Sequence, residues 1–145
     1  MFRGNKTVKL DGKGRLSIPT HYRTQLLEAY GGKVVVAPDI HSPCLNLYPL
    51  PEWELMEEKI AQLPGRQQST LRRFVIGRSQ ECEMDGTGRI LLSQELRDYA
   101  NLDKGAILAG VGFKMELWDE AAWREVSQPE ELSEDDLNQL QDVYF

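Results

Sequence analysis

The feature that most constrains the fold of this chain is a five-residue signature that occurs twice. Asp11–Arg15 reads Asp-Gly-Lys-Gly-Arg, and Asp85–Arg89, 74 residues later, reads Asp-Gly-Thr-Gly-Arg. A second echo follows each copy, since Leu45–Tyr48 matches Met115–Trp118 at an offset of 70 residues. Two matching segments in the same order indicate an internal duplication. The fold is therefore expected to contain two copies of one unit.

Each signature predicts a tight turn between two short strands. An Asp side chain can bond the backbone ahead of it, and glycine readily adopts positive φ. We assign a structural role in these turns to Asp11, Gly12, Gly14, Asp85, Gly86 and Gly88. A nucleotide-binding loop would need a longer glycine pattern than Gly-x-Gly. The expected flanking strands cover residues 6–10, 15–18, 81–84 and 89–92.

The remainder of each unit contains one helix and two more strands. Pro19 and Gly31-Gly32 bound a helix over 20–30, and Ser93 is a suitable N-cap for a helix over 94–100. Apolar runs predict further strands at 33–37, 45–48, 106–109 and 114–118. A helix closes each unit. The expected fold class is mainly β with short helices, that is, α+β.

Helical patterns also connect the two copies. Apolar residues recur at helical spacing at Trp53, Met56, Ile60 and Leu63. Pro64-Gly65 ends this pattern, and Leu71, Phe74 and Val75 predict a second helix. The pair is expected to pack one repeat on the other. We divide the chain into repeat one (1–63), an inter-repeat helix (64–80), repeat two (81–127) and an acidic C-terminal tail (128–145).

Charge is segregated along the chain. The formal net charge is −6, but residues 128–145 contain six acids and no base. Residues 1–27 contain six bases and one acid, and the acid-free stretch 66–78 contains four arginines. Local field, not net charge, steers an anionic ligand, so nucleic acid stays a candidate partner. The tail has two interpretations: a short acidic helix on Leu132, Leu137 and Leu140 capped by Ser133, or a mobile segment.

Several functional classes are disfavoured. The sequence has no long apolar run and no signal-peptide pattern, so we expect no membrane association. Cys44 and Cys82 lie far apart, as reduced thiols of a cytoplasmic protein would. His41 and Cys44 form an isolated pair, whereas a zinc site normally needs four ligands. Catalytic motifs are also missing. We therefore expect no enzyme activity, no metal, no cofactor and no small-molecule substrate.

The chain resembles the MraZ family over nearly its whole length. The resemblance rests on Met1–Gly4, the two Asp-x-x-x-Arg signatures and the Arg72-Arg73-Phe74 segment. It implies two tandem AbrB-like swapped-hairpin repeats of β-barrel type that form one pseudo-symmetric unit. It also implies a cytoplasmic, nucleoid-associated transcriptional regulator, with repression expected. Such a protein binds short G-rich direct repeats upstream of its own operon, the cell-division and cell-wall gene cluster, and forms ring-shaped homo-oligomers.

Basic residues near the first turn suit double-stranded DNA. The fork of Arg15 matches guanine O6 and N7, whereas lysines suit phosphates. Thr87 replaces Lys13 in the second turn, so the first repeat is expected to contact DNA more strongly. The predicted DNA-binding residues are Arg3, Lys6, Lys9, Lys13, Arg15 and Arg89. Arg15 has an alternative role, because pairing with Asp11 would simply fix the turn. Arg89 has weaker basic surroundings, so a structural or interface role is an equal alternative for it.

A structural or protein-interaction role is the alternative function. Duplicated swapped-hairpin modules also occur in antitoxins, and an acidic tail can contact a basic protein. Arg72 and Arg73 are interpreted as helix-surface or subunit-contact residues. The large aromatic residues are interpreted as core or interface anchors: Tyr48, Trp53, Trp118 and Trp123. Steep salt dependence would distinguish a DNA-binding protein from a scaffold.

Overall fold

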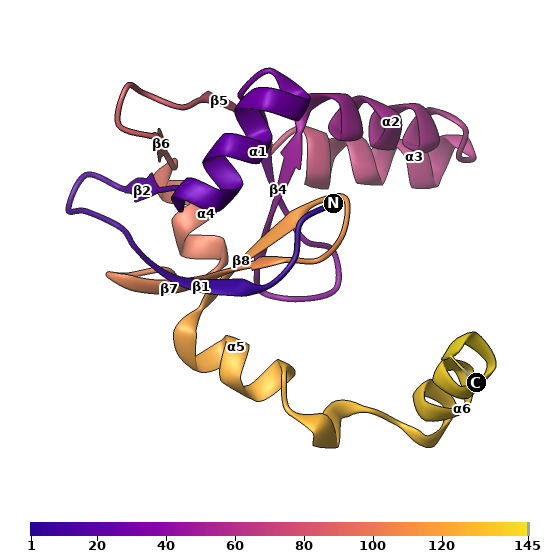
Figure 1. Ribbon diagram of the computed structural model, residues 1–145. Coiled ribbons are helices and arrows are strands. Elements are labelled where there is room, and N and C mark those ends of the chain that lie inside the picture. The colour runs from indigo at the N-terminus through magenta and orange to yellow at the C-terminus, as the bar shows by residue number, and fades with distance from the viewer. Residues whose placement is uncertain (145) are drawn as a thin grey trace.

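The computed structural model describes residues 1–144 and has the predicted two-copy order of elements (Figure 1). The first copy contains β1 (Asn5–Lys9), β2 (Arg15–Ser17), α1 (Thr20–Tyr30), β3 (Lys33–Pro38), β4 (Leu45–Pro49) and α2 (Leu50–Ala61). The second contains β5 (Gln80–Glu83), β6 (Arg89–Leu91), α4 (Gln94–Tyr99), β7 (Gly105–Gly110), β8 (Met115–Asp119) and α5 (Glu120–Val126). Between them lie α3 (Gly65–Leu71) and the π-helical turn η1 (Arg72–Ile76). The α+β class is confirmed.

The two copies exchange strands. The main sheet is antiparallel with six strands in the order β1-β7-β8-β4-β3-β5. The first strand of copy one, β1, pairs with β7 of copy two, and β5 of copy two pairs with β3 of copy one. The second strands, β2 and β6, pair with each other in a separate ribbon. Neither copy therefore completes its share of the sheet alone.

The expectation of barrel-type repeats needs correction, because the described residues contain no closed barrel. The main sheet is open, with β1 and β5 at its two edges. Each edge strand has one neighbour, and the ribbon, α1 and α4 cover the face that a barrel would enclose. The fold consequently has a layered α+β arrangement in place of a continuous cylinder.

The main core lies between one face of the sheet and its cover. The covering elements contribute side chains that are almost completely buried, including Leu16, Tyr22, Leu26, Ile90 and Leu96. These pack on alternate residues of the sheet, as period-two burial requires. Because both copies contribute side chains to this core, it joins them into one unit.

Helices cover the opposite face in two separate places. The hairpin of α2, α3 and η1 packs on β3 and β4, where Val35, Tyr48, Trp53 and Val75 are buried. On the other half of the sheet, the ring centroids of Trp123 of α5 and Trp118 of β8 are 6.3 Å apart. The hairpin thus packs mainly on copy one, contrary to the expectation that it joins the copies, although Phe74 contacts Tyr99 of copy two.

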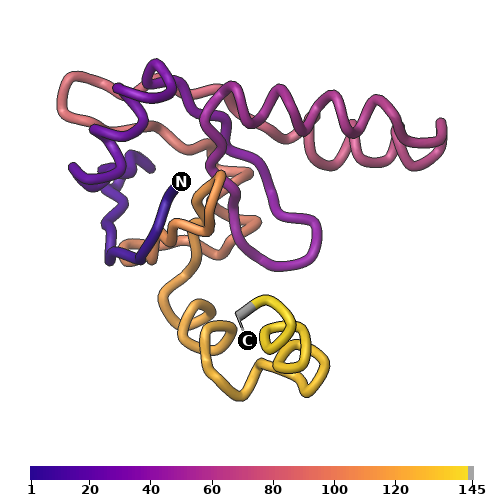
Figure 2. Tube along the Cα trace, turned by 45° about the vertical axis from the view of Figure 1, so that its right-hand side comes forward, coloured from indigo at the N-terminus to yellow at the C-terminus, as the bar shows by residue number. Residues whose placement is uncertain are grey.

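The C-terminal tail is helical at its end. After the short turn η2 (Pro129–Glu131), α6 runs over Glu134–Tyr144. Ser133 Oγ accepts from the Asp136 N–H at 3.1 Å, as the predicted cap requires. Figures 1 and 2 show this arm leaving the body below the sheet. Among the described residues, no helix is both long enough and apolar enough to cross a bilayer.

Candidate nucleic-acid interface

The first turn is organised around the carboxylate of Asp11. Its Oδ1 accepts from the backbone N–H groups of Lys13 and Arg15 at 3.0 and 2.9 Å. Its Oδ2 accepts from Arg15 Nε at 2.6 Å. Two backbone bonds close the loop, from Gly14 N–H to the Asp11 carbonyl and from Asp11 N–H to the Arg15 carbonyl, each 3.0 Å. The ion pair therefore fixes both the turn and the direction of the arginine.

The second turn repeats this arrangement with one difference. Asp85 Oδ1 accepts from the backbone of Thr87 and Arg89 at 2.9 and 3.0 Å, and Oδ2 accepts from Arg89 Nε at 3.2 Å. Thr87 also donates its hydroxyl to Asp85 Oδ1 at 2.8 Å. The side chain at this position faces its own turn, whereas Lys13 ends in an exposed ammonium group.

Both turns need glycine at their fourth position. Gly14 and Gly88 have φ values of 85° and 78°, a region that other residues rarely adopt. Gly12 and Gly86, by contrast, have ordinary φ and lie at the exposed tips. The left-handed residue directs the chain back from the turn into β2 or β6.

The ribbon of β2 and β6 places the two turns in one site. Leu16 pairs directly with Ile90, and these two residues are equivalent in the duplication, so the pseudo-two-fold axis passes between them. Both side chains point into the core. Arg15 and Arg89 lie on the outward face, and Arg89 Nη1 is 3.9 Å from Asp11 Oδ2. The signatures, distant in sequence, thus form a single surface.

A further arginine supports the first turn from the other copy. Arg97 of α4 donates from Nε to the Leu92 carbonyl at 3.2 Å. Its guanidinium lies against Gly14, where an added Cβ would be 2.7 Å from Nε. The conformation of the first turn therefore depends on a side chain of the second repeat.

Arg23 of α1 supports the second turn in the same way. It donates from Nη2 to the Ile18 carbonyl at 2.9 Å, and a side chain at Gly88 would collide with it. Its Nε is buried and has no hydrogen-bond partner within residues 1–144. The supporting roles of Arg23 and Arg97 were not predicted from the sequence. The 74-residue offset that aligns Arg15 with Arg89 nevertheless also aligns Arg23 with Arg97.

The turn carboxylates are held ionised. The Arg15 backbone N–H, with further hydrogen bonds and the guanidinium charge, lowers the pKa of Asp11 to about 2. The Arg89 backbone N–H and the Thr87 hydroxyl likewise hold the pKa of Asp85 well below its usual range. Each turn consequently carries a fixed Asp–Arg pair at neutral pH. Among the residues of the two signatures themselves, only Lys13 adds a positive charge without an acidic partner.

The other predicted basic residues lie along β1 at increasing distance from the turn. Lys9 is the last residue of β1, pairs with Gly105 of β7 and lies two residues before the turn. Lys6 is three residues earlier and pairs with Leu108. Arg3 lies beyond the far end of this strand, where its carbonyl accepts from Tyr22 Oη at 2.8 Å. Arg3 is therefore not part of the surface formed by the two turns.

A solvent-open hollow of about 610 Å³ lies beside the first turn. Its charged lining residues are of both signs: Lys9, Arg97 and Lys104, with Asp11, Asp103 and Glu120. The balanced lining does not select a ligand of one charge.

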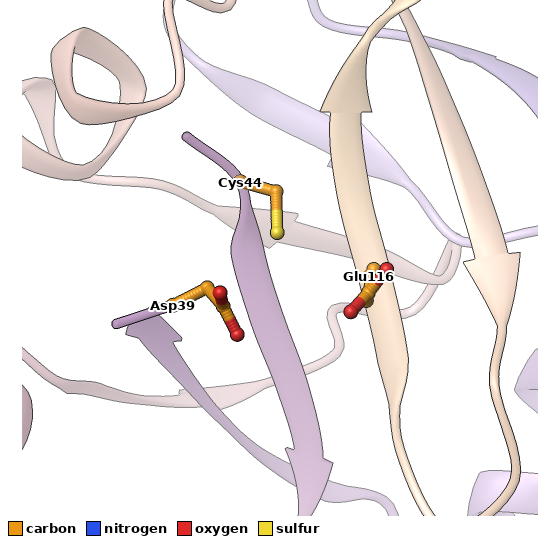
Figure 3. A group of neighbouring side chains, drawn as sticks. All are labelled: Asp39, Cys44 and Glu116. Atoms are coloured by element: carbon orange, nitrogen blue, oxygen red, sulfur yellow. The ribbon is translucent and has the colours of Figure 1, made fainter. Parts of the chain in front are cut away.

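Asp39, Cys44 and Glu116 form a separate polar group at the ends of β3, β4 and β8, and their ligand-type atoms lie within 4.8 Å of one another (Figure 3). Lys114 Nζ lies 3.8 Å from Asp39 Oδ1 and 3.7 Å from Glu116 Oε2. The ammonium group thus already supplies the positive charge that a cation would bring.

Asp39 also organises the loop that follows β3. Burial opposes its ionisation, but bonds from Asn46 Nδ2 and the His41 N–H keep its pKa below the usual value. Burial and the nearby carboxylates raise the pKa of the Cys44 thiol. These contacts give the group a structural role.

Comparison with known proteins matches the chain to one family over both repeats. The family model, described as "MraZ protein, putative antitoxin-like", matches residues 1–73 and 75–143. Proteins named "Transcriptional regulator MraZ" from Escherichia coli O9:H4 (strain HS) and Shigella boydii serotype 18 are each 47% identical over 150 aligned residues. Each alignment covers 99% of this chain and 99% of the relative.

Proposed function

The chain belongs to the MraZ family, and on that premise we propose that it is a transcriptional regulator that binds double-stranded DNA through its two Asp-Gly-x-Gly-Arg turns. The observation that carries this proposal is the convergence of both turns on the β2–β6 ribbon. A two-stranded ribbon fits the major groove of B-DNA. Arg15 and Arg89 lie half-exposed on one face of the ribbon, while its other face is anchored in the core.

Arg15 reads base edges in this proposal. Its Nε is bound to Asp11, so the two terminal nitrogens remain to bond guanine O6 and N7. The two roles that sequence left open for Arg15 are therefore compatible, because the carboxylate orients the group that recognises the base. Arg89 has the same geometry and acts at the second turn.

Lysines bind phosphates in this proposal. Lys13 is exposed at the tip, and Lys9 and Lys6 follow along β1. Arg3 lies at the far end of the strand and contacts DNA only where the duplex extends past the ribbon. Since Thr87 lacks a charge, the first repeat binds more strongly than the second.

The target and the assembly are inferred from the family. We take the repeats as AbrB-like swapped-hairpin units and keep the division into 1–63, 64–80, 81–127 and 128–145. One copy offers few DNA contacts, so a ring of copies on tandem G-rich promoter repeats gains affinity by avidity. The regulator acts in the cytoplasm on the nucleoid, represses its own division and cell-wall operon, and needs no cofactor or catalysis.

The test is fluorescence-anisotropy titration of DNA from upstream of the protein's own operon against scrambled DNA, at two salt concentrations. Arg15→Ala should lose about 1–3 kcal/mol of discrimination, or roughly 5- to 150-fold in affinity for the operator. Arg124→Ala is the matched control, because Arg124 is an exposed arginine of α5 paired only with Glu120.

Circular dichroism must show that both variants are folded. Selective, salt-sensitive binding that only Arg15→Ala loses would support the proposal. Equal weak binding of both DNAs by all three proteins would overturn it and favour the protein-interaction role.

A further inference from the structure

The C-terminal helix α6 presents two unused surfaces. Leu137, Leu140 and Val143 form an apolar stripe and are 49%, 38% and 76% exposed. The helix also carries four acids, three of them in its first turn: Glu134, Asp135, Asp136 and Asp142. Within residues 1–144, none of these acids forms an ion pair.

An isolated helix of this size is not stable by itself. It has 11 residues, and helices shorter than about 12–15 residues are marginal in water without packing. The Ser133 cap helps but leaves the apolar stripe in water. The helix therefore requires a partner surface that combines apolar contacts with positive charge.

The helical hairpin of this same protein has such a surface. No acid occurs between Glu58 and Glu81, and within that stretch Arg66, Arg72 and Arg73 are exposed. These three arginines form no ion pair in the described residues. Figure 1 shows α3 extending away from β2 and β6, and the proposed DNA contact does not use these arginines.

Apolar side chains accompany this charge. Leu63, which follows α2, is 37% exposed, and Ile40 of the β3–β4 loop is 50% exposed. A hollow of about 230 Å³ between this loop and the hairpin is lined by Ile40, Met56, Ile60 and Leu71. The hairpin thus offers a place for leucine side chains next to its arginines.

The occupant must come from a second copy of the chain. Figures 1 and 2 show the hairpin extending from the upper side of the sheet, while the arm leaves from the lower side. The arm begins where α5 is fixed by the Trp118–Trp123 contact. Because the arm and the hairpin leave on opposite sides, α6 does not lie on the hairpin of its own chain, and a second copy presents the same basic surface to it.

We infer that α6 of one copy docks on the α2–α3–η1 hairpin of a second copy, with the leucine stripe against the hairpin hollow and the acids opposite Arg66, Arg72 and Arg73. The contact is heterologous, since two different surfaces meet, and such contacts generate rings when they close. It gives a physical interface to the assembly invoked in the proposed function, but does not depend on DNA.

Cross-linking tests the contact directly. The two native thiols are buried, so introduced cysteines react selectively with a short bismaleimide. Chains carrying Gln141→Cys are co-expressed with tagged chains carrying Thr70→Cys. A product with the summed mass of the two chains is expected, and Arg124→Cys in place of Thr70→Cys should give none. No cross-linked product, or as much product with Arg124→Cys as with Thr70→Cys, would overturn the inference.

Charge exchange provides the second test, with assembly mass measured by light scattering in the absence of DNA. Asp135→Lys/Asp142→Lys and Arg72→Glu/Arg73→Glu should each reduce the assembly mass, and the four substitutions together should restore it. Wild-type mass in both double variants would refute the contact. Because no DNA is present, this result is separable from any failure of Arg15 to recognise an operator.

Discussion

Lys13 and Thr87 occupy the same place in the two turns but have different partners. The Thr87 hydroxyl bonds Asp85, whereas the Lys13 ammonium is free to meet a phosphate. Each phosphate contact releases counterions and adds about 0.9 to the slope of log affinity against log salt. Lys13→Thr should therefore lower the slope by about 1 per bound copy, and Thr87→Lys should raise it by a similar amount.

Anisotropy titrations across a salt series measure these slopes. The two substitutions serve as mutual controls, because each copies the residue of the other repeat. Unchanged slopes in both variants would mean that position three of the turn does not approach the phosphate backbone.

The Asp11 carboxylate makes the first turn sensitive to acid. Its pKa is lowered from 3.8 to about 2, chiefly by the bond from the Arg15 N–H. A folded-state pKa below the unfolded value stabilises the turn above the unfolded pKa, and this contribution is lost as pH falls through the folded pKa. The Lys13 and Arg15 amide signals should thus shift with a midpoint near the folded pKa of about 2.

Nuclear magnetic resonance follows this titration in the intact protein. Asp11→Asn keeps the shape of the side chain but not its charge, and should abolish the acid transition at these amides. A transition that persists in Asp11→Asn would assign it to another group.

Arg23 and Arg97 support each other's repeat. Arg97 lies on Gly14 and bonds the Leu92 carbonyl, so Arg97→Ala should perturb the amide signals of residues 11–15. Arg23→Ala should perturb residues 85–89 instead. Each loses a bond from a charged group, which typically contributes about 1.5–3 kcal/mol. Urea unfolding measures that loss, and shifts confined to each arginine's own helix would contradict the cross-support.

At the scale of elements, the β2–β6 ribbon depends on the two residues at its centre. Leu16 is completely buried and pairs with Ile90. Leu16→Ala should lower the free energy of unfolding by about 2–5 kcal/mol, since a cavity replaces a packed side chain. Leu91→Ala is the matched control, because Leu91 belongs to the same ribbon but is 55% exposed. Equal effects in urea titrations would show that the ribbon is not anchored as described.

Local chemistry was sufficient to predict most elements. The helix over 20–30 begins and ends where Pro19 and Gly31-Gly32 predicted, and Ser93 caps α4 through a bond from the Leu96 N–H. These features depend on residues that are neighbours in the sequence, so the sequence alone predicts them. The π-helical turn at Arg72–Ile76 was not predicted, because no distinct residue pattern marks its hydrogen bonding.

Strand partners were less predictable than strands. Alternating burial specifies which face of β1 is inside, but not which strand lies beside it. The sequence consequently predicted two like units, whereas the pairing of β1 with β7 and of β5 with β3 required the structure. The same exchange brings Arg97 onto Gly14. The sequence therefore predicted the turn residues of the candidate site but not the arginine that supports the first turn.

For the molecule as a whole, strand exchange predicts that the two repeats unfold together. If copy two unfolds, β1 loses β7 and β2 loses β6, and the shared core loses half its side chains. Trp53 reports on copy one, and Trp118 and Trp123 report on copy two. In Trp53→Phe and in Trp118→Phe/Trp123→Phe, the fluorescence transition in urea should therefore coincide with that variant's own circular-dichroism transition. Comparison within each variant removes any change in stability that the substitution itself causes. A fluorescence midpoint that departs from the circular-dichroism midpoint in either variant would show that a repeat can open alone, and hence that the paired turns are not held as one surface.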